Sequence, residues 1–158
     1  MEESTEMITT GTDAESPRAS GAGTKTRILV VDDEVGPRES LRMILKSSYE
    51  IATADSGDTA LKSLATFAPD LVFMDIKMPK MDGIELLRRI KAIDPTIEAV
   101  MITAYASLDT VKNALTHGAF EYLIKPFSRT DLEDTARRAL ARRQSEVGKS
   151  SQLSGLVN

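Results

Sequence analysis

Four short apolar runs in this sequence each end in polar side chains that can bind a cation or an anion. They are Asp32 and Asp33 after the run 28–31, Asp75 after 71–74, Thr103 after 100–102, and Lys125 after 122–124. If the runs are neighbouring parallel strands, three carboxylates, a hydroxyl and an ammonium meet at one edge of a sheet. Such a set of groups suits a hard divalent cation together with a phosphoryl group.

Three carboxylates that lie close together repel one another, and a proton or a metal ion relieves the repulsion. Oxygen ligands without His or Cys favour Mg²⁺ or Mn²⁺ over Zn²⁺. We expect Asp33 and Asp75 to be direct ligands, and Asp32 to bind directly or through water. The alternative is that the two adjacent acids simply occupy a polar turn before a helix. The other polar residues at matching strand ends argue against that alternative.

Composition limits the class of protein. The 158 residues allow one domain with tails, and an apolar content of 41% can supply its core. The chain has no Cys, which excludes disulfides and thiolate nucleophiles. Its net charge is −4, mostly from the acidic first 26 residues, so no broad nucleic-acid surface is expected. Without a membrane-length apolar run or a signal-peptide pattern, we expect a cytoplasmic protein with no membrane contact.

The ends of the chain differ from its middle. Residues 1–26 are rich in Ser, Thr, Gly and acids, so we expect a disordered N-terminal tail. Residues 146–158 are expected to form a short C-terminal tail. One domain is therefore predicted over residues 27–145.

Within that domain, apolar runs alternate with helical patterns. Strands are expected at 27–31, 49–54, 71–74, 99–102 and 122–124. The second run is weaker and alternating, so we place it at a sheet edge. Helices are expected to begin at Pro37, near Asp58, after Asp82, after Ser107 and after Ser128. This alternation predicts a five-stranded parallel α/β sheet covered on both faces, with ligands at the carboxyl ends of the strands.

Two of these helices carry more detailed expectations. Asp82 and Glu85 have the spacing of a capping box. The helix after Ser107 has Leu108, Val111 and Leu115 at the spacing of one apolar face.

Four segments carry recognisable motifs: Ile28-Leu-Val-Val-Asp-Asp-Glu34, Met74-Asp-Ile-Lys-Met-Pro-Lys-Met-Asp-Gly83, Met101-Ile-Thr-Ala104 and Tyr122-Leu-Ile-Lys-Pro-Phe127. In this order and spacing they resemble the receiver domain of bacterial two-component response regulators, over about residues 27–145. The resemblance implies a flavodoxin-like (βα)5 fold with strand order 2-1-3-4-5. Residues 38–42 and 103–107 are most similar to receivers of the enhancer-binding, NtrC-like class.

The resemblance implies roles for the matching positions. Asp75 would accept a phosphoryl group from a sensor histidine kinase or a phosphotransfer protein. Mg²⁺ would be held by Asp32, Asp33, Asp75 and the main-chain carbonyl of Lys77. Thr103 and Lys125 would each contact a phosphoryl oxygen. The chain would then be a phosphoacceptor that assists its own phosphotransfer and dephosphorylation, and not an enzyme.

The resemblance also implies a switch. Tyr122 would turn inward when Thr103 moves, and the Lys125-Pro126 peptide bond would be cis. Contacts at the fourth helix, fifth strand and fifth helix would change, and a homodimer could form there. Lys77 and Tyr105 would border the path of the hydrolytic water and slow its attack. The chain would act on an unidentified protein target, as a stand-alone regulator or a phosphorelay intermediate.

Three alternatives stay open at this stage. The chain could be a receiver detached from a DNA-binding transcriptional activator. It could be a Mg²⁺-dependent phosphatase with an Asp nucleophile, although such enzymes usually have a second Asp where this chain has Lys77. It could also be a receiver-like binding module that is not phosphorylated, although such modules usually lack one of the five polar residues.

The single His, His117, is expected to be a solvated residue near a helix end.

Overall fold

The computed structural model describes residues 25–105 and 107–157, so most of the predicted N-terminal tail lies outside the described residues. The strands are β1 (Arg27–Val31), β2 (Glu50–Ala54), β3 (Leu71–Asp75), β4 (Glu98–Thr103) and β5 (Glu121–Ile124). The helices are α1 (Val35–Leu45), α2 (Gly57–Phe67), α3 (Gly83–Ile93), α4 (Leu108–Thr116) and α5 (Arg129–Val157). Each predicted strand agrees with the structure to within one residue at either end.

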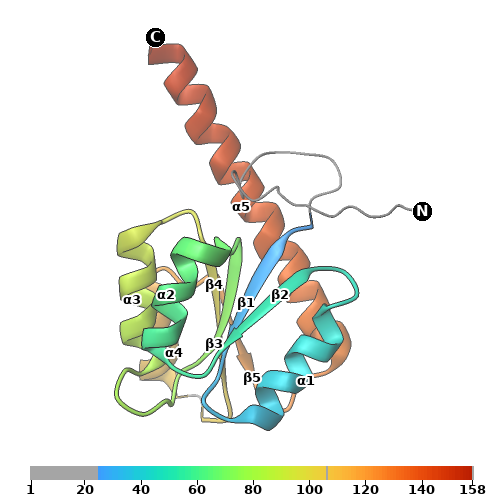
Figure 1. Cartoon of the computed structure of the whole chain (residues 1–158). Coiled ribbons are helices and arrows are strands. Elements are labelled where there is room, and N and C mark those ends of the chain that lie inside the picture. The colour runs from blue at the N-terminus through green and yellow to red at the C-terminus, as the bar shows by residue number, and fades with distance from the viewer. Residues whose placement is uncertain (1–24, 106, 158) are drawn as a thin grey trace, which may run out of the picture.

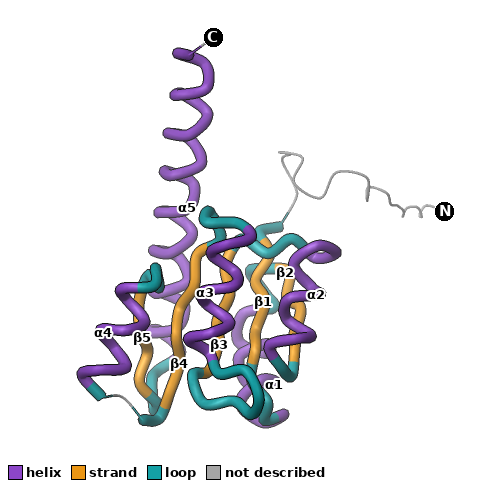
Figure 2. Tube along the Cα trace, turned by 90° about the vertical axis from the view of Figure 1, so that its left-hand side faces the viewer, coloured by secondary structure: helices purple, strands orange, loops and turns teal. Residues whose placement is uncertain are grey.

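The strands form one parallel sheet in the order β2-β1-β3-β4-β5, as the resemblance to receivers implies (Figure 1). Helices α1 and α5 cover one face, while α2, α3 and α4 cover the other (Figure 2). Among the described residues, no helix is long and apolar enough to cross a membrane.

The strands are buried because their apolar runs supply both faces of the sheet. In β1, Ile28 and Val30 pack toward α1 and α5, whereas Leu29 and Val31 pack toward α2 and α3. Both faces of such a strand are buried, so its residues are apolar on both sides and do not alternate with polar ones. This burial explains the continuous apolar pattern. The weaker strand β2 does lie at an edge, as predicted.

Side-chain caps fix the starts of α2, α3 and α4. Ser56, Asp82 and Ser107 each accept a hydrogen bond from the backbone N–H three residues later. The capping box predicted at Asp82 is only half formed, because the Glu85 carboxylate pairs with Arg88 and Arg89 instead. The other predicted start that differs is α1, which begins at Val35, two residues before Pro37.

The predicted apolar face of α4 is wrong. Leu108 is 74% exposed and Leu115 is 48% exposed, whereas Ala114 is the only buried residue of this fully described helix. Helix α4 packs over the end of the sheet where β5 is the last strand, so only a narrow stripe of the helix meets the core.

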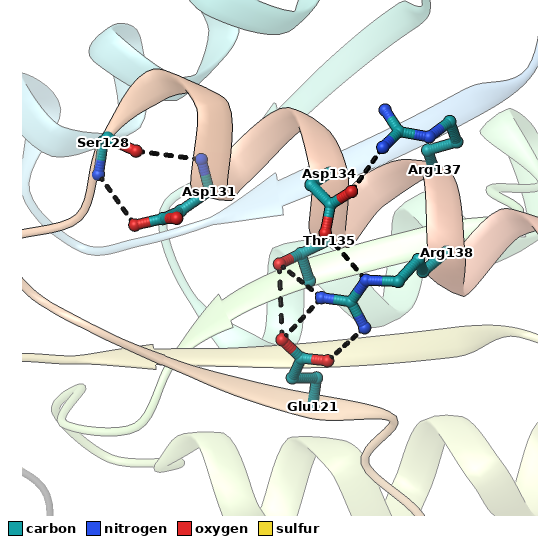
Figure 3. Close-up of polar contacts among 7 residues, drawn as sticks. All are labelled: Glu121, Ser128, Asp131, Asp134, Thr135, Arg137 and Arg138. Atoms are coloured by element: carbon teal, nitrogen blue, oxygen red, sulfur yellow. Dashed lines mark hydrogen bonds and ion pairs between the residues drawn. The ribbon is translucent and has the colours of Figure 1, made fainter.

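Helix α5 is held to the sheet by its apolar stripe and by arginines. Glu121 of β5 accepts hydrogen bonds from both terminal nitrogens of Arg138, at 2.6 and 2.9 Å (Figure 3). Arg142 and Arg143 pair with Glu98 and Asp70, at 3.3 and 3.2 Å. The helix continues to Val157 and projects past the sheet, so the predicted domain boundary at residue 145 falls inside α5 (Figure 1).

Gly83, the first residue of α3, allows this helix to approach the end of β3. A Cβ atom built on Gly83 would lie 2.3 Å from the carbonyl oxygen of Asp75 and 2.8 Å from the Cα atom of Ile76. Both are backbone atoms, so the backbone around Asp75 would have to move to make room for any side chain.

We therefore expect Gly83→Ala to destabilise the fold by about 2 kcal/mol, in the range of overpacking in a well-packed interior. Urea unfolding monitored by circular dichroism would measure the loss. Gly36→Ala in α1 is the matched control, because no atom lies within 4 Å of the added Cβ. It should be neutral or stabilise by about 0.5 kcal/mol through helix propensity. Equal stability of the two variants would refute the close-approach role of Gly83.

Candidate functional site

The carboxyl ends of β1 and β3 bring three acids together. Val31 pairs with Met74 in neighbouring parallel strands, so the residues that follow them emerge side by side. Asp32, Asp33 and Asp75 each offer a carboxylate oxygen, and these oxygens lie within 4.8 Å of one another. Asp32 is only 2% exposed, Asp75 is half-buried and Asp33 is exposed. The cluster is thus open to solvent on the side of Asp33.

Lys125, which follows β5, places its ammonium group against this cluster. Its Nζ atom lies 3.7 Å from Oδ2 of Asp32 and 3.6 Å from Oδ2 of Asp75. The cluster has three carboxylates and this one ammonium contacts only two of them, so the site keeps a negative charge that a further cation can neutralise.

Backbone N–H groups orient two of the carboxylates. The N–H of Glu34 donates to Oδ1 of Asp32 at 2.9 Å, and the N–H of Lys77 donates to Oδ1 of Asp75 at 3.1 Å. Burial raises the pKa of Asp32, and the Asp75 carboxylate raises it further. The hydrogen bond from Glu34 and the charge of Lys125 act in the opposite direction.

Thr103 ends β4 and is 1% exposed. Its hydroxyl oxygen accepts a hydrogen bond from the N–H of Tyr105 at 3.1 Å, and no described residue accepts the hydroxyl proton, which can therefore be donated to a bound group. Its carbonyl oxygen accepts a hydrogen bond from the N–H of Lys125 at 2.8 Å. Thr103 and Lys125 are therefore linked through their main chains. The Lys125-Pro126 bond is cis, as predicted.

Tyr122 lies on the face of the sheet that α2, α3 and α4 cover, and its ring packs against that core. Its hydroxyl is buried and has no hydrogen-bond partner among the described residues. Burial raises the pKa of Tyr122; the neighbouring Thr110 side chain lowers it, although the two hydroxyls lie outside hydrogen-bonding geometry. The Tyr122 ring thus points inward in this structure, and its expected movement with Thr103 stays a prediction.

Lys77 and Tyr105 meet beside the acidic cluster. The Nζ atom of Lys77 lies 5.2 Å from the centroid of the Tyr105 ring, within the range of a cation–π contact. The two residues line an open pocket of about 450 Å³ together with Ile76, Ala104, Ser107 and Thr110.

Sequence reasoning missed two residues that shape the site. Arg38 donates a hydrogen bond from Nη1 to the main-chain carbonyl oxygen of Asp32 at 2.7 Å. Gly83 was noticed only as part of a motif, and its closeness to the Asp75 backbone is visible only in three dimensions. The available signal for Arg38 was its position, because it lies on an expected helix shortly after the two acids.

Together these groups can hold a hard cation between carboxylate oxygens and can present the half-buried Asp75 oxygen to an electrophile. Lys125 and the Thr103 hydroxyl supply a positive charge and a hydrogen-bond donor at the same sheet edge. No His or Cys takes part in the cluster, which is the donor set that Mg²⁺ prefers. The residues present therefore fit a magnesium ion.

Comparisons with known proteins identify the family of the chain. Residues 28–137 match the family model described as the response regulator receiver domain. The chain is 43% identical over 115 residues to the transcriptional regulatory protein ZraR of Escherichia coli, covering 72% of this chain and 26% of that protein. It is 38% identical over 115 residues to the sporulation initiation phosphotransferase F of Bacillus subtilis, covering 72% of this chain and 93% of that protein.

A crystal structure of a CheY-like receiver domain protein from Methanospirillum hungatei has the same fold. The TM-score is 0.75 at 32% identity, covering 78% of this chain and 99% of the other. The chain spans only about a quarter of the transcriptional regulator's length, so that whole protein's activity does not transfer with the match. The family match covers more than half of the chain, and the similarity to ZraR agrees with the expected likeness to enhancer-binding regulators. This chain belongs to the response regulator receiver domain family of two-component systems.

Proposed function

We propose that this receiver is switched by phosphorylation of Asp75. The donor would be a phosphohistidine on a sensor histidine kinase or a phosphotransfer protein. The observation that carries the proposal is the half-buried Asp75 carboxylate, with the Lys125 ammonium 3.6 Å away and two further carboxylates beside it. The chain would serve as a phosphoacceptor rather than as an enzyme acting on separate substrates.

In the transfer, a carboxylate oxygen of Asp75 forms a bond to phosphorus while the phosphorus–nitrogen bond of the donor breaks. The electron pair of that bond returns to the ring nitrogen of the donor histidine, which leaves as a neutral imidazole with the proton on its other ring nitrogen. Phosphoryl transfer passes through a loose, in-line transition state, so the protein mainly positions groups and offsets charge. Lys125 offsets charge on one phosphoryl oxygen, and the free proton of the Thr103 hydroxyl is donated to another.

Asp32, Asp33 and Asp75, with the main-chain carbonyl of Lys77, would hold Mg²⁺ or Mn²⁺. When bound, the cation would neutralise the clustered carboxylates and the incoming phosphoryl group. This assignment is supported by the closeness of the three carboxylates and by their all-oxygen donor set.

The output would be a change in protein contacts around α4 and β5. Drawing the Thr103 hydroxyl toward a phosphoryl group would alter its bond to Tyr105 and, through it, the packing of the partly buried Tyr122. The exposed side chains of Tyr105, Leu108, Leu115 and Ile124 offer an apolar surface in this region for a protein target or a second copy of the chain.

A stand-alone regulator or phosphorelay intermediate is supported by similarity to a phosphotransferase of which the match covers 93%. A receiver taken from a larger transcriptional activator is the second candidate, supported by the similarity to ZraR. The phosphatase alternative is not favoured, because Lys77 stands where the general acid of such enzymes would be.

Incubation with acetyl phosphate and Mg²⁺ should add one phosphoryl group to the wild type, because the site supplies its own electrostatic stabilisation. Phosphate-affinity electrophoresis and intact mass measurement would detect it. Asp75→Asn should abolish the shift. Asp109→Asn is the control, since Asp109 is an exposed acid in the first turn of α4 outside the cluster. Full modification of Asp75→Asn would refute the assignment of the nucleophile.

We also expect phosphorylated Asp75 to persist for minutes rather than seconds. The Lys77–Tyr105 pair lies beside Asp75, and excluding water from the line of attack slows hydrolysis without touching the nucleophile. Dephosphorylation after removal of the donor would be followed by mass measurement. A Lys77→Asn/Tyr105→Ala double variant should lose the group several-fold faster. Unchanged decay in that variant would show that the pair does not shield the site.

A further inference from the structure

The peptide group between Asp32 and Asp33 is held by a side chain from the following helix. Arg38, in the second turn of α1, donates from Nη1 to the carbonyl oxygen of Asp32 at 2.7 Å. Its own backbone N–H bonds the Glu34 carbonyl at 3.3 Å, which ties the same turn together. The guanidinium thus contacts the main chain of the loop that carries both acids.

This contact matters because the carbonyl belongs to the peptide plane that joins the two carboxylate residues. Rotation of that plane would turn Asp33 relative to Asp32. The Asp32 carboxylate is fixed separately, by the N–H of Glu34 and by burial. The exposed Asp33 carboxylate accepts no hydrogen bond from any described residue, so its direction depends on the backbone.

We propose that Arg38 is a positioning residue for the cation site, one that fixes the direction of the Asp33 carboxylate through the Asp32–Asp33 peptide. The inference rests on the proposed function, since it assumes that these acids bind Mg²⁺. Groups that orient metal ligands from outside the coordination shell typically contribute tenfold or more to metal affinity. Arg38 would act in that way on the main chain.

Electrostatics alone makes the opposite prediction. Arg38 is a cation near a cation site, so its removal should strengthen Mg²⁺ binding if charge were its only effect. Loss of positioning should weaken binding instead. The sign of the change therefore separates the two roles.

The test is Mg²⁺ titration of the full chain by isothermal calorimetry, with thermal unfolding in EDTA measured in parallel. Arg38→Gln should weaken binding about tenfold, as loss of an outer-shell partner does, while unfolding in EDTA stays close to that of the wild type. Arg38→Lys keeps the charge but lacks the geometry of the guanidinium. Its affinity for Mg²⁺ should fall between those of the wild type and Arg38→Gln. Arg42→Gln is the matched control on the same helix, because Arg42 pairs with the surface residue Glu39 at 2.8 Å and should not alter binding.

Unchanged or tighter Mg²⁺ binding by Arg38→Gln would overturn the inference while leaving the metal site intact. Absence of Mg²⁺ binding in the wild type would overturn both. If Arg38→Gln does not fold, Arg38→Lys decides: wild-type affinity in that variant would contradict a role that depends on the geometry of the guanidinium.

Discussion

Three carboxylates crowd one edge of the sheet, and a single ammonium group faces only two of them. Their mutual repulsion is the constraint on which the rest of the site depends. Burial of Asp32 adds to it, because desolvation disfavours the charged form and raises its pKa. A cluster of this kind lowers the stability of the fold when no bound cation offsets its charge. It gains most from a divalent cation, which offsets the charge of the carboxylates.

The fold keeps this cluster in place through main-chain contacts. Adjacent parallel strands deliver Asp32 and Asp75 side by side, and Gly83 lets α3 pack against the Asp75 backbone. The N–H of Lys125 is bonded to the carbonyl of Thr103, so the cationic group and the hydroxyl belong to one unit formed by β4 and β5. Asp75 contacts this unit through the Lys125 ammonium at 3.6 Å, so a change of charge at Asp75 would act on β4 and β5. Helix α4 is also the helix with the narrowest buried stripe, so it is well placed to respond.

Much of the fold and most of the site followed from the sequence for a physical reason. Strands buried on both faces require continuous apolar runs, and the polar residues that end such runs must share one edge of a parallel sheet. The rest depended on tertiary contacts that periodicity does not report. Leu108 and Leu115 have helical spacing but lie on a side of α4 that no described element covers. The contact of Arg38 with a main-chain carbonyl is polar, so no pattern of apolar residues in the sequence predicts it. Helix α5 is longer than the stretch of sequence that shows a periodic apolar pattern.

The most direct measurement is the free energy of unfolding of wild type and Asp32→Asn, at neutral pH, in EDTA and in saturating Mg²⁺. If the carboxylates repel as described, Asp32→Asn is the more stable protein in EDTA. Its advantage shrinks as the pH falls through the raised pKa of Asp32, because the wild-type residue then becomes neutral as well. In Mg²⁺ the order reverses, since only the wild type keeps the full set of ligands and gains binding free energy. Carboxylate repulsion would not have the central role if Asp32→Asn were less stable than the wild type in EDTA. The same holds if Mg²⁺ raised the free energy of unfolding of Asp32→Asn as much as that of the wild type.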